Sequence, residues 1–201
     1  MKGKTSATRG RPRTFDAEKA LDRALKVFWE KGYEAASLPD LTRAMGINRP
    51  SLYAAFGNKE SLFCKALNRY AEQNASYIQK ALNAPTAREV ARQILRGAID
   101  RSTRPGAPRG CLAVRGTLAC PDAGAAIHKT LRAQRAAGEA ALTARFQRAI
   151  DEGDLPRSAS PADLTRYLTT ILQGLSIQSS AGATRRDLLG IAETALHAFP
   201  D

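Results

Sequence analysis

The 201-residue chain has few of the side chains that most often perform catalysis or hold a metal, with three cysteines and two histidines. The cysteines are odd in number and irregularly spaced, which argues against a disulfide framework and favours a reducing cytoplasm. So few cysteines and histidines, with no carboxylates at ligand spacing, also argue against a metal site. We expect neither a metal nor a cofactor.

Long apolar runs are also absent. No stretch approaches the roughly 20 apolar residues that a membrane span needs. The N-terminus is basic, but no apolar run follows it, so no secretory signal is visible. We therefore expect a cytoplasmic protein with no membrane partner.

A catalytic triad is missing as well. Cys111 and His128 could supply a thiol nucleophile and a base, but no third residue that would orient them is evident. His128 alone on a helix is better interpreted as structural. We predict that the chain is not an enzyme.

Positive charge is abundant and unevenly distributed. The formal net charge is +12, and residues 1–13 contain lysines and arginines but no acid. Residues 158–201 are slightly acidic instead. This asymmetry favours a polyanionic partner at one end of the molecule, although a solvated basic tail is the simpler alternative.

The hydrophobic pattern follows helical spacing, and no segment alternates with period two for long enough to form a strand. Residues 104–110 contain proline and glycine and are expected to form a loop. The fold is therefore predicted to be all-α. Outside two short helices between residues 37 and 56, we expect helices at about 16–31, 59–82, 86–103, 111–119, 121–152, 160–181 and 184–199.

Residues 37–57 predict two short helices around a tight turn. Ser37 is a good N-cap for the first helix, and Gly46 can end it in the left-handed conformation. Asn48 can cap the second helix, which has Pro50 in its first turn. Such a short helix with polar and aromatic residues near its start suits a DNA major groove.

With Phe28, Gly32-Tyr33 and Lys59-Glu60 around it, this segment resembles the helix-turn-helix domain of TetR-family transcriptional regulators. The chain departs from the usual family pattern at Leu41, Thr42 and Met45, which affects packing between helices. A plain three-helix module remains the alternative. The resemblance implies a basic arm at 1–14, a DNA-binding domain at 15–62 and an effector-binding and dimerisation domain at 63–201.

The resemblance further implies a repressor that a small-molecule effector releases from a palindromic double-stranded DNA operator. Within the module, Ser37 and Lys59 lie at predicted helix starts, where phosphate oxygens are attracted. Tyr53 resembles the family's phosphate-contacting tyrosine.

Three residues of the second short helix are candidates for reading bases. Arg49 and Ser51 are the favoured readers, because arginine can donate two hydrogen bonds to guanine. Asn48 could read adenine or cap its helix, and capping is the favoured interpretation.

The basic arm contains Arg9-Gly10-Arg11-Pro12-Arg13, which resembles the core of minor-groove AT-hook peptides. Arg11 and Arg13 could then enter a narrow A·T minor groove. A generic cationic tail that contacts phosphates is the alternative.

The C-terminal part is expected to form the homodimer and to hold the effector. Two apolar stripes could pack as an intermolecular four-helix bundle, or could face their own subunit's core. The predicted interface comprises Leu164, Leu168, Ile171, Leu175, Leu188, Ile191, Ala195 and Phe199. The predicted effector pocket comprises Tyr77, Cys111, Phe146 and Gln173.

Gly110-Cys111-Leu112 resembles a segment found in one branch of the family, some of whose members sense oxidants or electrophiles. Nearby arginines would favour a reactive thiolate at Cys111, whereas a buried structural cysteine is the alternative. A thiol-sensing repressor and a non-specific architectural DNA-binding protein are therefore alternative functions.

Overall fold

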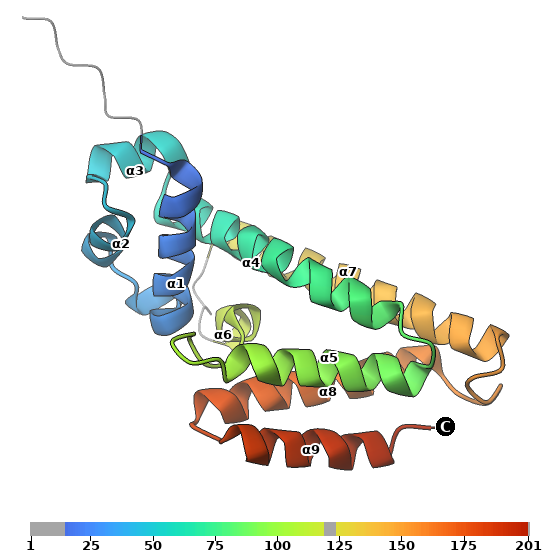
Figure 1. The fold of residues 1–201 in the computed structure, drawn as a ribbon. Coiled ribbons are helices and arrows are strands. Elements are labelled where there is room, and N and C mark those ends of the chain that lie inside the picture. Colours follow the sequence, from blue (N-terminus) through green and yellow to red (C-terminus); the bar gives the residue numbers. More distant parts are fainter. Residues whose placement is uncertain (1–14, 119–123, 201) are drawn as a thin grey trace, which may run out of the picture.

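The computed structural model describes residues 15–118 and 124–200, and all regular secondary structure in this part of the chain is helical (Figure 1). The predicted all-α fold is confirmed. The helices are α1 (Ala17–Ala35), α2 (Leu38–Met45), α3 (Arg49–Phe56), α4 (Lys59–Leu82), α5 (Ala87–Ser102), α6 (Leu112–Leu118), α7 (Ala125–Asp151), α8 (Pro161–Ser180) and α9 (Arg185–His197).

The helices form two groups (Figure 1). The short helices α2 and α3 lie with α1 at one end of the molecule, and the long helix α4 leads from there along α7. Helices α5, α8 and α9 pack together at the other end, with α9 outermost. The short helix α6 lies between α1 and this second group.

The first hydrophobic core joins α1–α3 to the first half of α4. Phe28 and Phe63 are fully buried at its centre, with their rings edge to face and 4.9 Å apart. The core extends along α4 to Tyr70 and also takes in Leu112 of α6. The predicted domain boundary between residues 62 and 63 thus falls within α4 and within this core, and it remains a prediction.

The second core lies among α5, α7, α8 and α9. Phe146 of α7 is fully buried there, and its ring lies 5.5 Å from that of Phe199. The buried residues Val90 and Leu95 of α5 belong to the same core.

The predicted dimer stripes require correction, because most of their side chains belong to this second core. The predicted residues recur at helical spacing along α8 and α9. The helix face on which they lie packs inside the protomer. Buried in this way are Leu168, Leu175, Leu188 and Phe199, while Leu164 and Ile171 are partly buried against the same core. Ala195 is also buried, although it is not a member of this core. Of the eight predicted residues, only Ile191 is exposed.

Candidate DNA interface and effector pocket

The two short helices form a helix-turn-helix whose geometry follows from local hydrogen bonds. Gly46 ends α2 in the left-handed conformation (φ 70°, ψ 30°), as the sequence predicted. Two residues later, the Asn48 side chain accepts a hydrogen bond from the Ser51 backbone N–H at 2.8 Å and caps α3. Leu52 and Phe56 anchor α3 in the first core. The opposite side of α3 is left free.

That free side presents the predicted DNA-contacting side chains. Arg49 is exposed, Ser51 is partly exposed and the Tyr53 side chain is 46% exposed. The Arg49 guanidinium makes no hydrogen bond or ion pair with the residues that the structure describes. Its donors are therefore available to an external acceptor.

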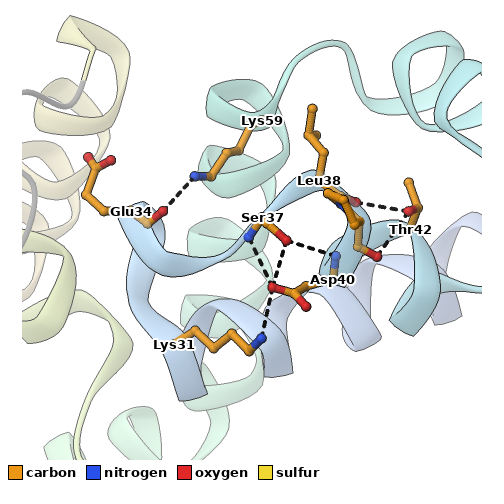
Figure 2. A network of polar contacts seen from close by, with 8 residues as sticks. Lys31, Glu34, Ser37, Leu38, Asp40, Thr42 and Lys59 are labelled. Carbon is orange, nitrogen blue, oxygen red and sulfur yellow. Dashed lines mark hydrogen bonds and ion pairs between the residues drawn. The ribbon is translucent and has the colours of Figure 1, made fainter.

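Asn48 and Ser37 have their side chains occupied by capping. The Ser37 hydroxyl donates to Asp40 at 2.8 Å and accepts from the Asp40 backbone N–H, and Lys31 pairs with the same carboxylate at 2.9 Å (Figure 2). Lys31 and Ser37 lower the pKa of Asp40 to about 2, so this group is ionised at neutral pH. A phosphate at this helix start would meet a carboxylate, and the Ser37 and Asp40 N–H groups are already bonded, which weakens the predicted role of Ser37.

Lys59 is half-buried, and its side chain is already engaged by the protein itself. Its ammonium group donates to the Glu34 backbone carbonyl at 3.2 Å (Figure 2). The same group lies 4.5 Å from the centre of the Tyr33 ring. The predicted phosphate contact would require part of this arrangement to be released. Arg11 and Arg13 lie outside the described residues.

One exposed cation that the sequence analysis did not select is Arg43, in the last turn of α2. It lies just before the Gly46 turn, on the element that precedes α3. Arg43 lies three residues before Gly46, the predicted turn glycine. This position was the sequence signal that could have identified Arg43.

The second candidate site is a cavity of about 300 Å³ that is lined by α4, α5, α7, α8 and the segment around α6. Its walls are mainly apolar, with a few polar side chains. Gln173 and Thr169 contribute from α8, while Gln134 and Glu139 contribute from α7. Mainly apolar walls with a few placed polar groups are typical of small-molecule sites.

The structure brings three of the four predicted pocket residues to this cavity. Tyr77, Cys111 and Gln173 line it, although they come from different parts of the chain. Phe146 does not line it, because its side chain points into the second core. His128 lines a separate, smaller cavity of about 70 Å³, so Cys111 and His128 do not share a site.

Two residues beside Cys111 escaped the sequence analysis. Tyr70 is almost fully buried, and burial together with its neighbour Cys111 raises the pKa of its hydroxyl. The Arg101 guanidinium lies 5.9 Å from the Tyr70 ring centre and 5.6 Å from that of Tyr77. These residues come from α4 and α5, and no local pattern links them to Cys111.

Comparison with known proteins assigns this architecture to a family. Residues 20–65 match the model of bacterial regulatory proteins of the tetR family, and residues 85–190 match the tetracyclin repressor-like C-terminal domain. The chain belongs to the TetR family. It is accordingly a DNA-binding transcriptional regulator.

The TetR-family relatives are similar over nearly their whole length. The HTH-type transcriptional repressor ComR of Escherichia coli K12 is 35% identical over 197 residues, which cover 96% of this chain and 93% of ComR. A solved structure of a cysteine-substituted CifR with 26-base-pair operator DNA is 43% identical, with a TM-score of 0.89 over 94% of this chain and 100% of CifR. A TetR regulator from Rhodococcus sp. RHA1 is 37% identical, with a TM-score of 0.63, over 90% of this chain and 97% of that chain.

This TetR-family protein also has an exposed apolar face on α8 and α9. Ile177 is 49% exposed and Ile191 is 38% exposed. Gly174 and Gly190 lie within these helices, and a Cβ added at either would meet no atom within 4 Å. Both glycines are therefore open to close approach by another chain. No helix in the described residues is long and apolar enough to cross a membrane.

Proposed function

We propose that this protein is a homodimeric repressor that binds a palindromic operator and is released by a small apolar effector. One observation carries the proposal. The exposed face of α3 is anchored in the first core, and α4 connects that core to a preformed cavity. A DNA-binding regulator acts where the chromosome lies, so we place its activity in the cytoplasm.

The roles on α3 follow from exposure and chemistry. Arg49 has unengaged donors, which suit guanine or a phosphate. Ser51 contributes a hydroxyl from the first turn of α3, and Tyr53 contributes a hydroxyl that can position one DNA strand. Asn48 acts as the cap that sets the start of α3. Arg11 and Arg13 of the basic arm add contacts in the minor groove.

The proposed dimer uses the exposed face of α8 and α9 rather than the stripes in the second core. A glycine inside a helix costs about 0.5–1 kcal/mol relative to alanine, so two outward-facing glycines need a reason. A partner helix that packs on Gly174 and Gly190 would supply it, and Ile177 and Ile191 would then be covered. Replacing Ile191 by Glu should yield monomers in analytical ultracentrifugation, whereas an unchanged dimer would reject this face.

The proposed effector fits the cavity by size and polarity. A volume of about 300 Å³ is at the small end of the range for ligand sites, so a compact molecule is expected. Gln173 and Tyr77 can orient its polar group, while Ile94 and Leu172 contact its apolar part. Release of DNA requires that the effector bind the DNA-incompetent state more tightly.

A thiol-sensing repressor is the second candidate, because Cys111 lines the cavity. In this case an electrophile should release DNA, and Cys111→Ser should bind operator yet fail to respond. Intact-protein mass spectrometry separates the two candidates. Release of DNA from protein with unmodified Cys111 would leave only the non-covalent effector.

The repressor proposal is tested with an operator selected from random DNA and measured by fluorescence anisotropy. A specific repressor should bind its site about 10³-fold or more tightly than random DNA at the same salt concentration. Arg49→Ala should cost about 1–3 kcal/mol and relax one base preference in each half-site. Tyr53→Phe should weaken all sequences about equally.

The matched control is Arg166→Ala, which removes an exposed arginine of α8 far along the chain from α3. It should leave operator affinity unchanged. Equal affinity for selected and random DNA would instead support the architectural DNA-binding alternative. Unchanged selectivity in Arg49→Ala would remove that residue from base readout.

A further inference from the structure

The end of α1 and the wall of the effector cavity meet through one short segment around α6. Leu112 is fully buried in the first core, with Trp29 of α1. Its neighbours Cys111, Ala113 and Val114 line the effector cavity. The same segment therefore contacts the DNA-binding core and forms part of the cavity wall.

Two hydrogen bonds fasten this segment to α1. The Trp29 indole N–H donates to the Gly110 carbonyl at 3.2 Å in a buried position, and the Arg115 guanidinium donates to the Glu30 carbonyl at 3.0 Å. Helical conformation in α1 is interrupted shortly afterwards at Gly32 (φ 79°). Carbonyls in the last turn before such a break lack helical donors, so Arg115 supplies one.

The other side of the segment is held by α8. The Ser176 hydroxyl accepts from the Cys111 backbone N–H at 2.8 Å. Gly110 has φ +81°, and a Cβ there would overlap the Ser180 hydroxyl and lie 3.0 Å from the Ser176 carbonyl. The backbone at Gly110 and Cys111 is thus held between α1 and α8. A displacement of this backbone relative to α8 must therefore also change its contact with α1.

We propose that the Trp29–Gly110 and Arg115–Glu30 hydrogen bonds, here named the α1 latch, transmit the state of the cavity to the DNA-binding domain. This inference rests on the proposed repressor function. The latch is closed in the DNA-competent state. A molecule that displaces the wall formed by Cys111 and Val114 opens it and changes the orientation of α1, and with it α3.

This route differs from transmission along α4 alone. The α4 helix connects the two cores by its length, whereas the latch joins the cavity wall directly to the end of α1. Trp29 and Arg115 act as positioning residues, since neither belongs to the α3 face that we propose for DNA. Removing the Trp29 donor, or shortening the Arg115 side chain so that it no longer reaches the Glu30 carbonyl, should therefore uncouple the two sites while DNA binding remains.

The test uses the coupling between the two sites, because a cavity whose state affects DNA binding must itself be affected by bound DNA. Alkylation of Cys111 by N-ethylmaleimide is followed by peptide mass spectrometry, with and without saturating selected operator. We expect DNA to slow the wild-type reaction about fivefold or more. In Trp29→Phe and Arg115→Gln the ratio of rates should fall toward one, with operator still bound.

Arg166→Gln is the matched control, because it also removes an exposed arginine but lies away from the latch, and it should keep the wild-type ratio. Arg115→Gln changes no residue of the first core. If the Trp29→Phe protein does not fold, the rate ratio in Arg115→Gln alone tests the latch. A wild-type ratio of one, or a wild-type ratio retained in Arg115→Gln, would overturn the latch. Absence of a selective operator would instead reject the repressor function, and the latch with it.

Discussion

The two ends of the molecule organise their polar groups in opposite ways. At the DNA-binding end, Asp40, Ser37 and Lys31 form an exposed network around a helix start (Figure 2). At the far end of α4, Arg145 of α7 is only 5% exposed and donates to the backbone carbonyls of Leu82, Ala84 and Pro85.

This difference shows where each end needs rigidity. Exposed networks contribute little free energy, but they fix a helix start and leave it accessible to a partner. A buried arginine that satisfies backbone carbonyls instead fixes how one helix ends and the next begins. The surface end is therefore built for recognition, while the buried clamp holds α4 and α5 beside the cavity.

The largest expected effect tests whether the two cores are independent. Phe63→Ala in the first core and Phe146→Ala in the second should each lower the free energy of unfolding by about 3–5 kcal/mol. Because α4 and α7 contribute to both cores, we expect one cooperative transition. Urea unfolding is followed by the fluorescence of Trp29, the single tryptophan, and by far-ultraviolet circular dichroism.

Trp29 lies in the first core, so it reports on that end alone. In Phe146→Ala its transition should shift together with the circular dichroism. A Trp29 transition that stays at the wild-type urea concentration would mean that the two ends unfold separately.

The next effect concerns the buried clamp. Arg145→Met keeps an apolar chain but leaves three carbonyls without their donor, and a buried unsatisfied group costs about 1–3 kcal/mol. The variant no longer pays the desolvation cost of burying the Arg145 charge, and this offsets part of the loss. We expect a net loss of about 2–3 kcal/mol in the free energy of unfolding, measured in urea.

The control is Arg148→Met, one turn along α7. Arg148 is exposed and pairs with Glu152 at 3.5 Å. Exposed pairs at this helical spacing contribute about 0.3–0.5 kcal/mol, so this variant should be nearly neutral. Equal losses in the two variants would show that the carbonyl contacts of Arg145 are not what stabilises the far end.

The same contrast explains what the sequence could predict. The caps at Ser37 and Asn48 and the turn at Gly46 depend on residues within four positions, and each was predicted correctly. Most helix spans followed in the same way from local spacing, although α1 continues to Ala35, beyond its predicted end at residue 31. The DNA-binding family resemblance came from this local pattern.

Sequence reasoning failed where the partner lies far along the chain. A stripe such as Leu168 and Leu175 shows that a helix face is buried, but not which helix covers it. Phe146 was assigned to the pocket for the same reason, although it faces Phe199. The role of Arg145 could not be predicted from local sequence, because the carbonyls that it contacts lie 60 to 63 residues earlier in the chain.

The smallest effect compares the two capping boxes at opposite ends of the molecule. Ser37 and Asp40 start α2, and Thr184 and Asp187 start α9 by the same pattern. The pKa of Asp40 is lowered first by Lys31, whereas that of Asp187 is lowered first by the Thr184 hydroxyl. An aspartate whose pKa is lowered on folding stabilises the protein above its unfolded pKa, near 3.9, and loses that contribution as the pH falls through the folded value.

We therefore expect the free energy of unfolding in urea to fall between about pH 5 and about pH 2, with Asp40 and Asp187 both contributing. Asp40→Asn and Asp187→Asn keep a side-chain oxygen for the cap but remove the charge. Asp40→Asn should flatten the pH dependence more, because Lys31 lies 2.9 Å from that carboxylate. A larger flattening in Asp187→Asn would show that the hydroxyl, not the cation, dominates these exposed caps.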